Sequence, residues 1–184
     1  MTDTKTSPLH DVIAKAPTPE VVARLDRWLR LNPDAWVRLY HGTDARFPVQ
    51  TEGLLPTSQR RRNSLQSRSG YVSFSLFPEH AELFAQLAYP QRTVTVYGAD
   101  LRVGELVPDL DQLRNQRQWA ERDVKSTLAH SLAYGHGAQV KGAVAGARLF
   151  SVKICIPRRS ASIGPSPTGA VNVAPSQAIR PRIV

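Results

Sequence analysis

Acidic residues are missing from the last third of this chain. No Asp or Glu follows Asp123, and a second stretch without acids lies between Glu52 and Glu79. The chain carries 24 Lys and Arg against 15 acidic residues, which gives a net charge of +9 at neutral pH. The basic excess is therefore unevenly spread. Such regions attract polyanions, either a nucleic acid or the pyrophosphate of a dinucleotide, although a solubilising surface is the plainer use.

Cysteine and long apolar runs are also scarce. The single cysteine, Cys155, excludes an internal disulfide, and its strand-like surroundings favour a small core residue over a nucleophile. No apolar run reaches the roughly 18 residues of a membrane span, and the first residues lack the order of a signal peptide. We therefore expect a soluble, cytoplasmic protein without a membrane partner, in the producer's own cytoplasm or in that of a target cell.

Length and composition predict one globular unit of the α+β class. A chain of 184 residues with 41% hydrophobic content can bury one core. Apolar spacing over 18–31, with Thr18 as N-cap and Pro19 in the first turn, predicts an amphipathic helix. We expect residues 1–34 to form an N-terminal helical extension. Residues 35–184 should form a domain with a mixed or antiparallel sheet under helices.

Short apolar runs predict the elements of this domain. Helices are expected from Pro78 and over 110–133, and the strand at 93–97 is expected to pair with 105–107. Residues 57–69 are polar and rich in Arg and Ser, which is typical of an exposed loop. The five histidines lack zinc-like spacing, so we expect no metal site. Strands are predicted at 35–41, 71–77, 93–97, 105–107, 143–144, 149–156, 171–173 and 179–184.

The first motif with chemical potential surrounds His41. A histidine at a strand end can hold a ligand hydroxyl by donating from one ring nitrogen while the fold fixes the other, although such a residue can also be purely structural. The segment Leu39-Tyr40-His41-Gly42-Thr43 resembles the first motif of the His-Tyr-Glu class of ADP-ribosyltransferases, the group of the poly-ADP-ribose polymerases and diphtheria toxin. The resemblance implies that this segment binds NAD, the glycine backbone holding the nicotinamide amide and His41 the ribose.

The second motif supports the same family. Ser73 and Phe84 are eleven residues apart, as are the tyrosine of a Gly-x-Tyr strand and a second aromatic in that class, whose rings enclose nicotinamide. The run Tyr71-Val72-Ser73-Phe74-Ser75 also resembles the aromatic-x-Ser-Thr-Ser strand of the Arg-Ser-Glu class of the same superfamily. The resemblance implies that Ser73 and Phe84 contact NAD, and that Tyr71 or Phe74 supplies the first ring. For Phe84 a core position is the alternative.

The third motif lacks its catalytic residue. The family requires a glutamate at the start of a late strand, which binds the ribose 2′-hydroxyl and stabilises the oxocarbenium-like transition state. Residues 169–179 resemble that segment, and Ala170 occupies the place of the glutamate. Either the natural protein has lost catalysis, or a deliberate Glu-to-Ala change has made a toxic enzyme expressible; we favour the second. Glu121 and Asp123 are the only late acids, and their neighbours favour solvated ion pairs.

The arginines of the two basic stretches complete the hypothesis. Arg60 and Arg68 lie between the first two motifs and suit the pyrophosphate of NAD. Arg158 and Arg159 precede the third motif, on the side that faces the acceptor in this superfamily, and suit the phosphates of a nucleic acid.

Together, these features predict a mono-ADP-ribosyltransferase toxin or effector. Its acceptor is a macromolecule, with RNA or DNA favoured over protein, and an antitoxin or immunity protein is a further expected partner. The alternatives are an enzyme like RNA 2′-phosphotransferase, which shares the fold and needs no glutamate, and a non-catalytic module that binds NAD or a polyanion.

Overall fold

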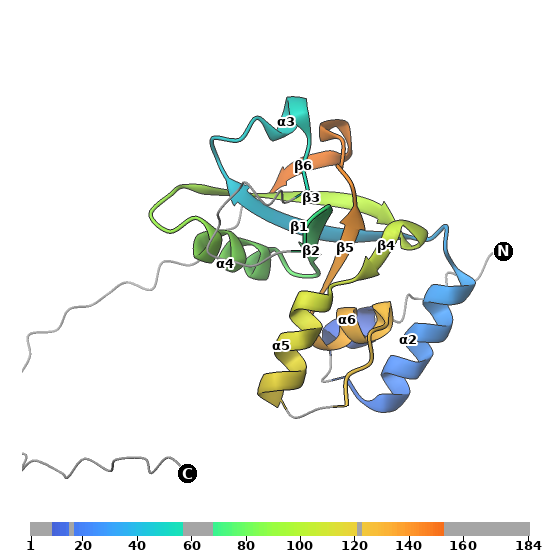
Figure 1. The fold of residues 1–184 in the computed structure, drawn as a ribbon. Helices are drawn as coiled ribbons and strands as arrows, with labels where there is room; N and C mark the ends of the chain where they lie inside the picture. The colour runs from blue at the N-terminus through green and yellow to red at the C-terminus, as the bar shows by residue number, and fades with distance from the viewer. Residues whose placement is uncertain (1–8, 15–16, 57–67, 121–122, 153–184) are drawn as a thin grey trace, which may run out of the picture. The chain divides into compact units, whose positions relative to one another are not determined.

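A six-stranded antiparallel sheet forms the centre of the protein (Figure 1). The structure is a computed structural model, and it describes residues 9–14, 17–56, 68–120 and 123–152. The strand order is β4-β5-β2-β1-β3-β6, and helices flank the sheet, so the predicted α+β class is confirmed. The strands are β1 (Trp36–Asp44), β2 (Tyr71–Ser75), β3 (Val94–Arg102), β4 (Leu106–Pro108), β5 (Gly137–Lys141) and β6 (Leu149–Val152).

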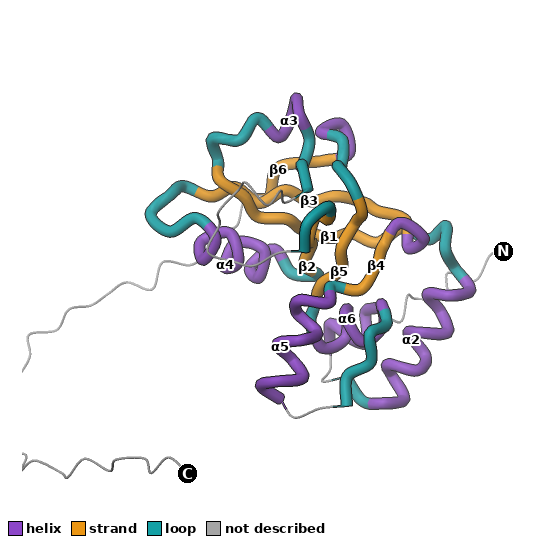
Figure 2. The backbone as a smooth tube through the Cα atoms, viewed as in Figure 1, coloured by secondary structure: helices purple, strands orange, loops and turns teal. Residues whose placement is uncertain are grey.

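Two groups of helices cover different strands. The helix α4 packs against β1 and β3, whereas α6 packs against β4 and β5 and also contacts α2 and α5. Figure 2 shows α2, α5 and α6 grouped beside β4. Among the described residues, no helix is long and apolar enough to cross a membrane. The helices are α1 (Leu9–Ala14), α2 (Pro19–Leu31), α3 (Val49–Glu52), α4 (Pro78–Ala88), α5 (Leu110–Ala120) and α6 (Leu128–Tyr134), with short turns η1 (Val103–Glu105) and η2 (Gly146–Arg148).

The helix α2 forms as its sequence predicts. Thr18 is the N-cap, its hydroxyl accepts from the Val21 backbone N–H at 3.4 Å, and Pro19 opens the first turn. Leu25 and Leu29 are buried at helical spacing and belong to the same apolar core as the strands. The N-terminal helix therefore contributes to the packing of the sheet.

The sheet is joined through a single point between β1 and β2. Strand β1 pairs with β3 over nine residues, but with β2 only where Tyr40 lies opposite Ser75. Strand β2 instead pairs with β5 along its whole length. The sheet thus consists of two well-paired halves, β1-β3-β6 and β2-β5-β4, whose inner strands diverge on either side of one residue pair.

Several predicted elements differ from the structure. Strand β3 does not pair with β4, because β4 pairs with β5, which the sequence analysis did not predict. Strand β5 begins with Gly137 and is followed by Gly142, and Val140 is its only β-branched residue, so its sequence pattern is weak. The helical region at 110–133 is two helices, and Gly42 and Thr43 lie inside β1. The strands predicted at 171–173 and 179–184 lie outside the described residues.

Gly42 allows α4 to approach β1 closely. A Cβ atom at Gly42 would overlap the backbone carbonyl of Ala81 and lie 2.8 Å from the Cβ of Ala85. Both alanines are buried and occupy the face of α4 that meets the sheet. The space that a side chain at position 42 would need is filled by this helix. Gly42 also lines the cavity, so the approach of a ligand to its backbone stays a prediction.

The variant Gly42→Ala should therefore unfold more easily than the wild type. The added methyl group has to push α4 away from β1, and overpacking of this kind costs about 1–3 kcal/mol of the free energy of unfolding. Urea unfolding followed by circular dichroism measures the change. Gly104→Ala is the control, since its new Cβ is exposed and would meet nothing closer than the Pro33 carbonyl at 3.3 Å. Equal urea midpoints for the two variants would contradict this account of Gly42.

Candidate functional site

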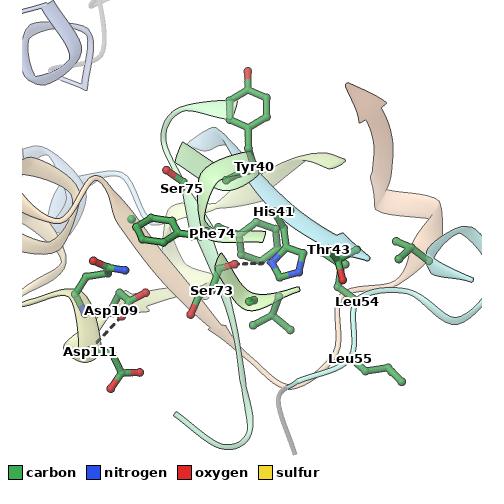
Figure 3. Close-up of a pocket in the computed structure, with 18 of the residues that line it drawn as sticks. Tyr40, His41, Thr43, Leu54, Leu55, Ser73, Phe74, Ser75, Asp109 and Asp111 are labelled. Carbon is green, nitrogen blue, oxygen red and sulfur yellow. Dashed lines mark hydrogen bonds between the residues drawn. The ribbon is translucent and has the colours of Figure 1, made fainter. Parts of the chain in front are cut away.

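A cavity of about 520 Å³ adjoins the point where β1 and β2 diverge (Figure 3). Cavities of this size commonly hold small molecules or cofactors. Both inner strands contribute to its wall, together with α4, the first turns of α5 and the turn before β5. Its lining includes Tyr40, His41, Gly42, Thr43, Phe47, Glu52, Leu55, Ser73, Phe74, Ser75, Phe84, Tyr89, Asp109, Asp111, Gln112, Arg114, Asn115 and His136.

The imidazole of His41 links the two diverging strands. Its Nδ1 atom lies 2.7 Å from the backbone carbonyl oxygen of Ser73, close to where the backbone pairing ends. A carbonyl oxygen can only accept, so Nδ1 carries a proton. Burial lowers the pKa of His41, which favours the neutral ring. The remaining nitrogen, Nε2, is therefore a hydrogen-bond acceptor. The sequence predicts that His41 donates to a ligand hydroxyl; with the Nδ1 proton bonded to Ser73, the other ring nitrogen can only accept from one.

The protonation state of His41 can be measured directly. Nitrogen-15 NMR of the full chain should show His41 as the neutral Nδ1–H tautomer, with a pKa below the ordinary value of about 6.5. The pKa is lowered because burial opposes the charged ring. The neutral form therefore persists to lower pH than in a free histidine. An Nε2–H tautomer of His41 at neutral pH would contradict the assignment.

The aromatic walls come from β2 and α4. The ring of Phe74 lies 5.7 Å from that of His41, and both residues line the cavity, as does Phe84 from α4. Tyr71 does not line the cavity. The guanidinium of Arg68, which does not line the cavity either, stacks over the Tyr71 ring at 4.1 Å from its centroid. Of the two candidates for the first ring, Phe74 is the one in the wall.

The structure brings together most of the residues that the two motifs predict. The backbone N–H of Arg68 donates to the Asp111 carboxylate at 2.9 Å, which places this arginine beside the cavity's edge. Arg60 and Ala170 lie outside the described residues, as do Arg158 and Arg159. The predicted residues that line the cavity are His41, Gly42, Thr43, Ser73 and Phe84.

Asp109 is a cavity residue that sequence reasoning missed. It is almost fully buried, and its Oδ1 atom accepts from the backbone N–H groups of Asp111 and Gln112, both at 3.1 Å. Burial raises the pKa of its carboxyl group, while those N–H bonds and the nearby Ser73 hydroxyl oppose the rise. An Asp directly before a helix is a common N-cap, which was a signal for its capping role. Nothing local in the sequence placed it beside Ser73.

Gln139 of β5 was missed for a similar reason. Its side chain is fully buried and its Nε2 atom donates to the Ser73 hydroxyl at 3.1 Å. Its Oε1 atom has no hydrogen-bond partner within the described part of the chain. Because β5 pairs with β2 in a register that sets Gln139 opposite Ser73, the contact depends on a strand that the sequence analysis did not predict.

A buried ion-pair cluster holds the end of β1. The carboxylate of Asp44 is almost inaccessible and contacts Arg46 Nη2 at 2.8 Å and Arg92 Nη1 at 2.7 Å. Hydrogen bonds from Arg46, followed by those from Arg92, lower the pKa of Asp44. Arg92 belongs to the turn that leads from α4 into β3, so the cluster fixes this turn against the strand that carries His41. Asp44 itself does not line the cavity.

The variant Asp44→Asn should lose stability at neutral pH and lose less of it in acid. A lowered folded-state pKa contributes stability above the unfolded value of about 3.9, and that contribution disappears as the pH falls through the folded-state pKa. Urea midpoints measured from neutral pH down to strong acid should therefore converge for wild type and variant. Asp100→Asn, at an exposed pair with Arg38, is the control and should change stability little. Parallel curves for wild type and Asp44→Asn would contradict this role.

Comparisons with known proteins do not add to this geometry. No known family's model matches the chain, and no curated protein matches it either. Within the described ranges, no group of three or more His, Cys, Asp or Glu residues could hold a metal ion.

Proposed function

We propose that this protein is built as a mono-ADP-ribosyltransferase that uses NAD as its substrate. The observation that carries the proposal is the bond between His41 and Ser73, which joins the two predicted motifs at one cavity wall. These residues are separated by 32 positions in the sequence, and each belongs to a different motif of the resembled superfamily.

The wall chemistry suits the nicotinamide riboside half of NAD. Neutral His41 offers Nε2 as an acceptor for a ribose hydroxyl, and Phe74 and Phe84 offer apolar surface to a flat ring. In the proposed reaction, the glycosidic bond between C1′ and the pyridinium nitrogen breaks and its electron pair leaves with nicotinamide. An acceptor atom then forms a bond to C1′ and releases its proton. The task of the protein is to hold the ribose and stabilise the cationic transition state.

The catalytic carboxylate is the missing part of the proposal. Ala170 stands where the resembled family has glutamate, so this chain should bind NAD and turn it over poorly or not at all. Loss of an electrostatic contact made chiefly in the transition state lowers the rate by about 10²–10³-fold and changes ground-state binding little.

For the acceptor we favour a nucleic acid. The support is the charge of the chain, which is +9 overall with no acidic residue after Asp123. Phosphate contacts would bring such an acceptor to the site before any base is recognised. A toxin or effector that acts in a cell's cytoplasm fits this reaction, with an antitoxin or immunity protein as its natural partner.

Restoring the carboxylate tests the proposal. Ala170→Glu, incubated with labelled NAD and cell lysate, should release nicotinamide at least about 100-fold faster than the parent chain and label a macromolecule. Ala170→Gln is the matched control, because it has the same size without the charge, and it should remain silent. Nuclease or protease treatment of the product then classifies the acceptor.

The same experiment separates the alternatives. Calorimetric binding of NAD by the parent chain without turnover by Ala170→Glu would favour the non-catalytic module, an alternative that the alanine at position 170 itself supports. The transferase and the non-catalytic module both predict that His41→Asn loses NAD binding. Asn can keep the bond to the Ser73 carbonyl but cannot replace the Nε2 acceptor. If neither the parent chain nor Ala170→Glu binds NAD, the proposal fails.

A further inference from the structure

The cavity has the opposite charge to the chain as a whole. Three carboxyl groups line it, from Glu52, Asp109 and Asp111, and Arg114 supplies the only guanidinium among its described lining residues. Burial raises the pKa of Asp109, and a cation beside this group would favour its ionised form. Its two histidines, His41 and His136, both have pKa values lowered chiefly by burial, which favours their neutral forms. A protein with a net charge of +9 therefore presents a negative cavity to its ligand.

Acceptor groups also lie beside Ser73 in the cavity wall. The carboxyl group of Asp109 is within reach of the Ser73 hydroxyl, and both residues line the cavity. Figure 3 shows the Asp109 carboxyl on the side of α5 that faces Ser73, with Asp111 beyond it. Together with Nε2 of His41, these acceptors complement a ligand that brings N–H donors or a positive charge.

Aromatic rings form the remaining part of the wall. Phe47 and Tyr89 pack edge to face with ring centroids 5.7 Å apart, and Phe74 and Phe84 line the same cavity. Aromatic faces attract cations as well as flat apolar rings. Carboxylates and aromatic rings in one cavity thus favour a ligand that is both planar and positively charged.

We infer that this cavity selects a positively charged N-heterocycle over its neutral counterpart, and that Asp109 is the main source of this selectivity. The inference deepens the proposed function and rests on it, because the oxidised nicotinamide of NAD is such a ring and free nicotinamide is not. It assigns to Asp109 a specificity role beyond capping α5. It also gives the site a physical reason to bind the substrate and release the product, since the ring loses its charge when the glycosidic bond breaks.

Two small probes test the inference on the full chain. 1-Methylnicotinamide is a cation and nicotinamide is neutral, and the two have nearly the same shape. Titrations followed by NMR should show the wild type binding the cation roughly tenfold more tightly. Asp109→Asn keeps a good helix N-cap and removes only the charge, so it should bring the ratio of the two affinities close to one without weakening nicotinamide.

The controls separate local charge from folding and from net charge. Asp109→Ser also preserves a cap, and thermal unfolding of both variants verifies the fold. Asp34→Asn removes a charge that is 89% exposed and outside the cavity, and it should leave the ratio unchanged. The inference is overturned if the wild type binds both probes equally or binds neither. It is also overturned if Asp109→Asn leaves the ratio of the two affinities unchanged. If the chain selects the cationic probe but neither it nor its Ala170→Glu variant binds NAD, the proposed function fails and the charge selectivity of the cavity stands.

Discussion

The hydrogen bond from His41 to the Ser73 carbonyl is the interaction on which the site depends. Strands β1 and β2 share one residue pair and then diverge, so the backbone ladder cannot hold them together at the cavity. The imidazole spans the gap with a bond of 2.7 Å. The same bond fixes the tautomer, and the tautomer decides what the free nitrogen can do to a ligand. Structure and chemistry are therefore set by one contact.

The segment around His41 satisfies several independent constraints. Side chains alternate along a strand, so His41 and Thr43 face one side while Gly42 faces the other, against α4. The next residue, Asp44, is buried between two arginines that hold the following turn. These packing constraints act on the His-Gly-Thr segment whether or not the protein binds or turns over a substrate.

Local signals in the sequence predicted local structure well. The cap and spacing of α2 and the proline that opens α4 depend only on neighbouring residues, and both helices form where expected. Strand pairing is non-local, and it was not predicted correctly. Strand β5 has a weak strand pattern in its sequence and pairs with β2 and β4, which are far from it in the chain. The residues of the site fall into the same two groups. His41 and Ser73 belong to short motifs that the sequence shows, whereas Asp109 and Gln139 lie near Ser73 only because β5 pairs with β2 and β4.

The contrast between a basic chain and an acidic cavity constrains how a dinucleotide could lie. NAD carries a positive ring at one end and a negative pyrophosphate in its middle. A wall with three carboxylates suits the ring and repels the phosphates, so the phosphates must leave the cavity towards basic groups outside it. Arg68 is such a group, since Asp111 anchors its backbone at the cavity's edge while its guanidinium rests on Tyr71. If NAD binds as proposed, the charge pattern that opposes a phosphate inside the cavity would orient it with the ring inward and the pyrophosphate outward.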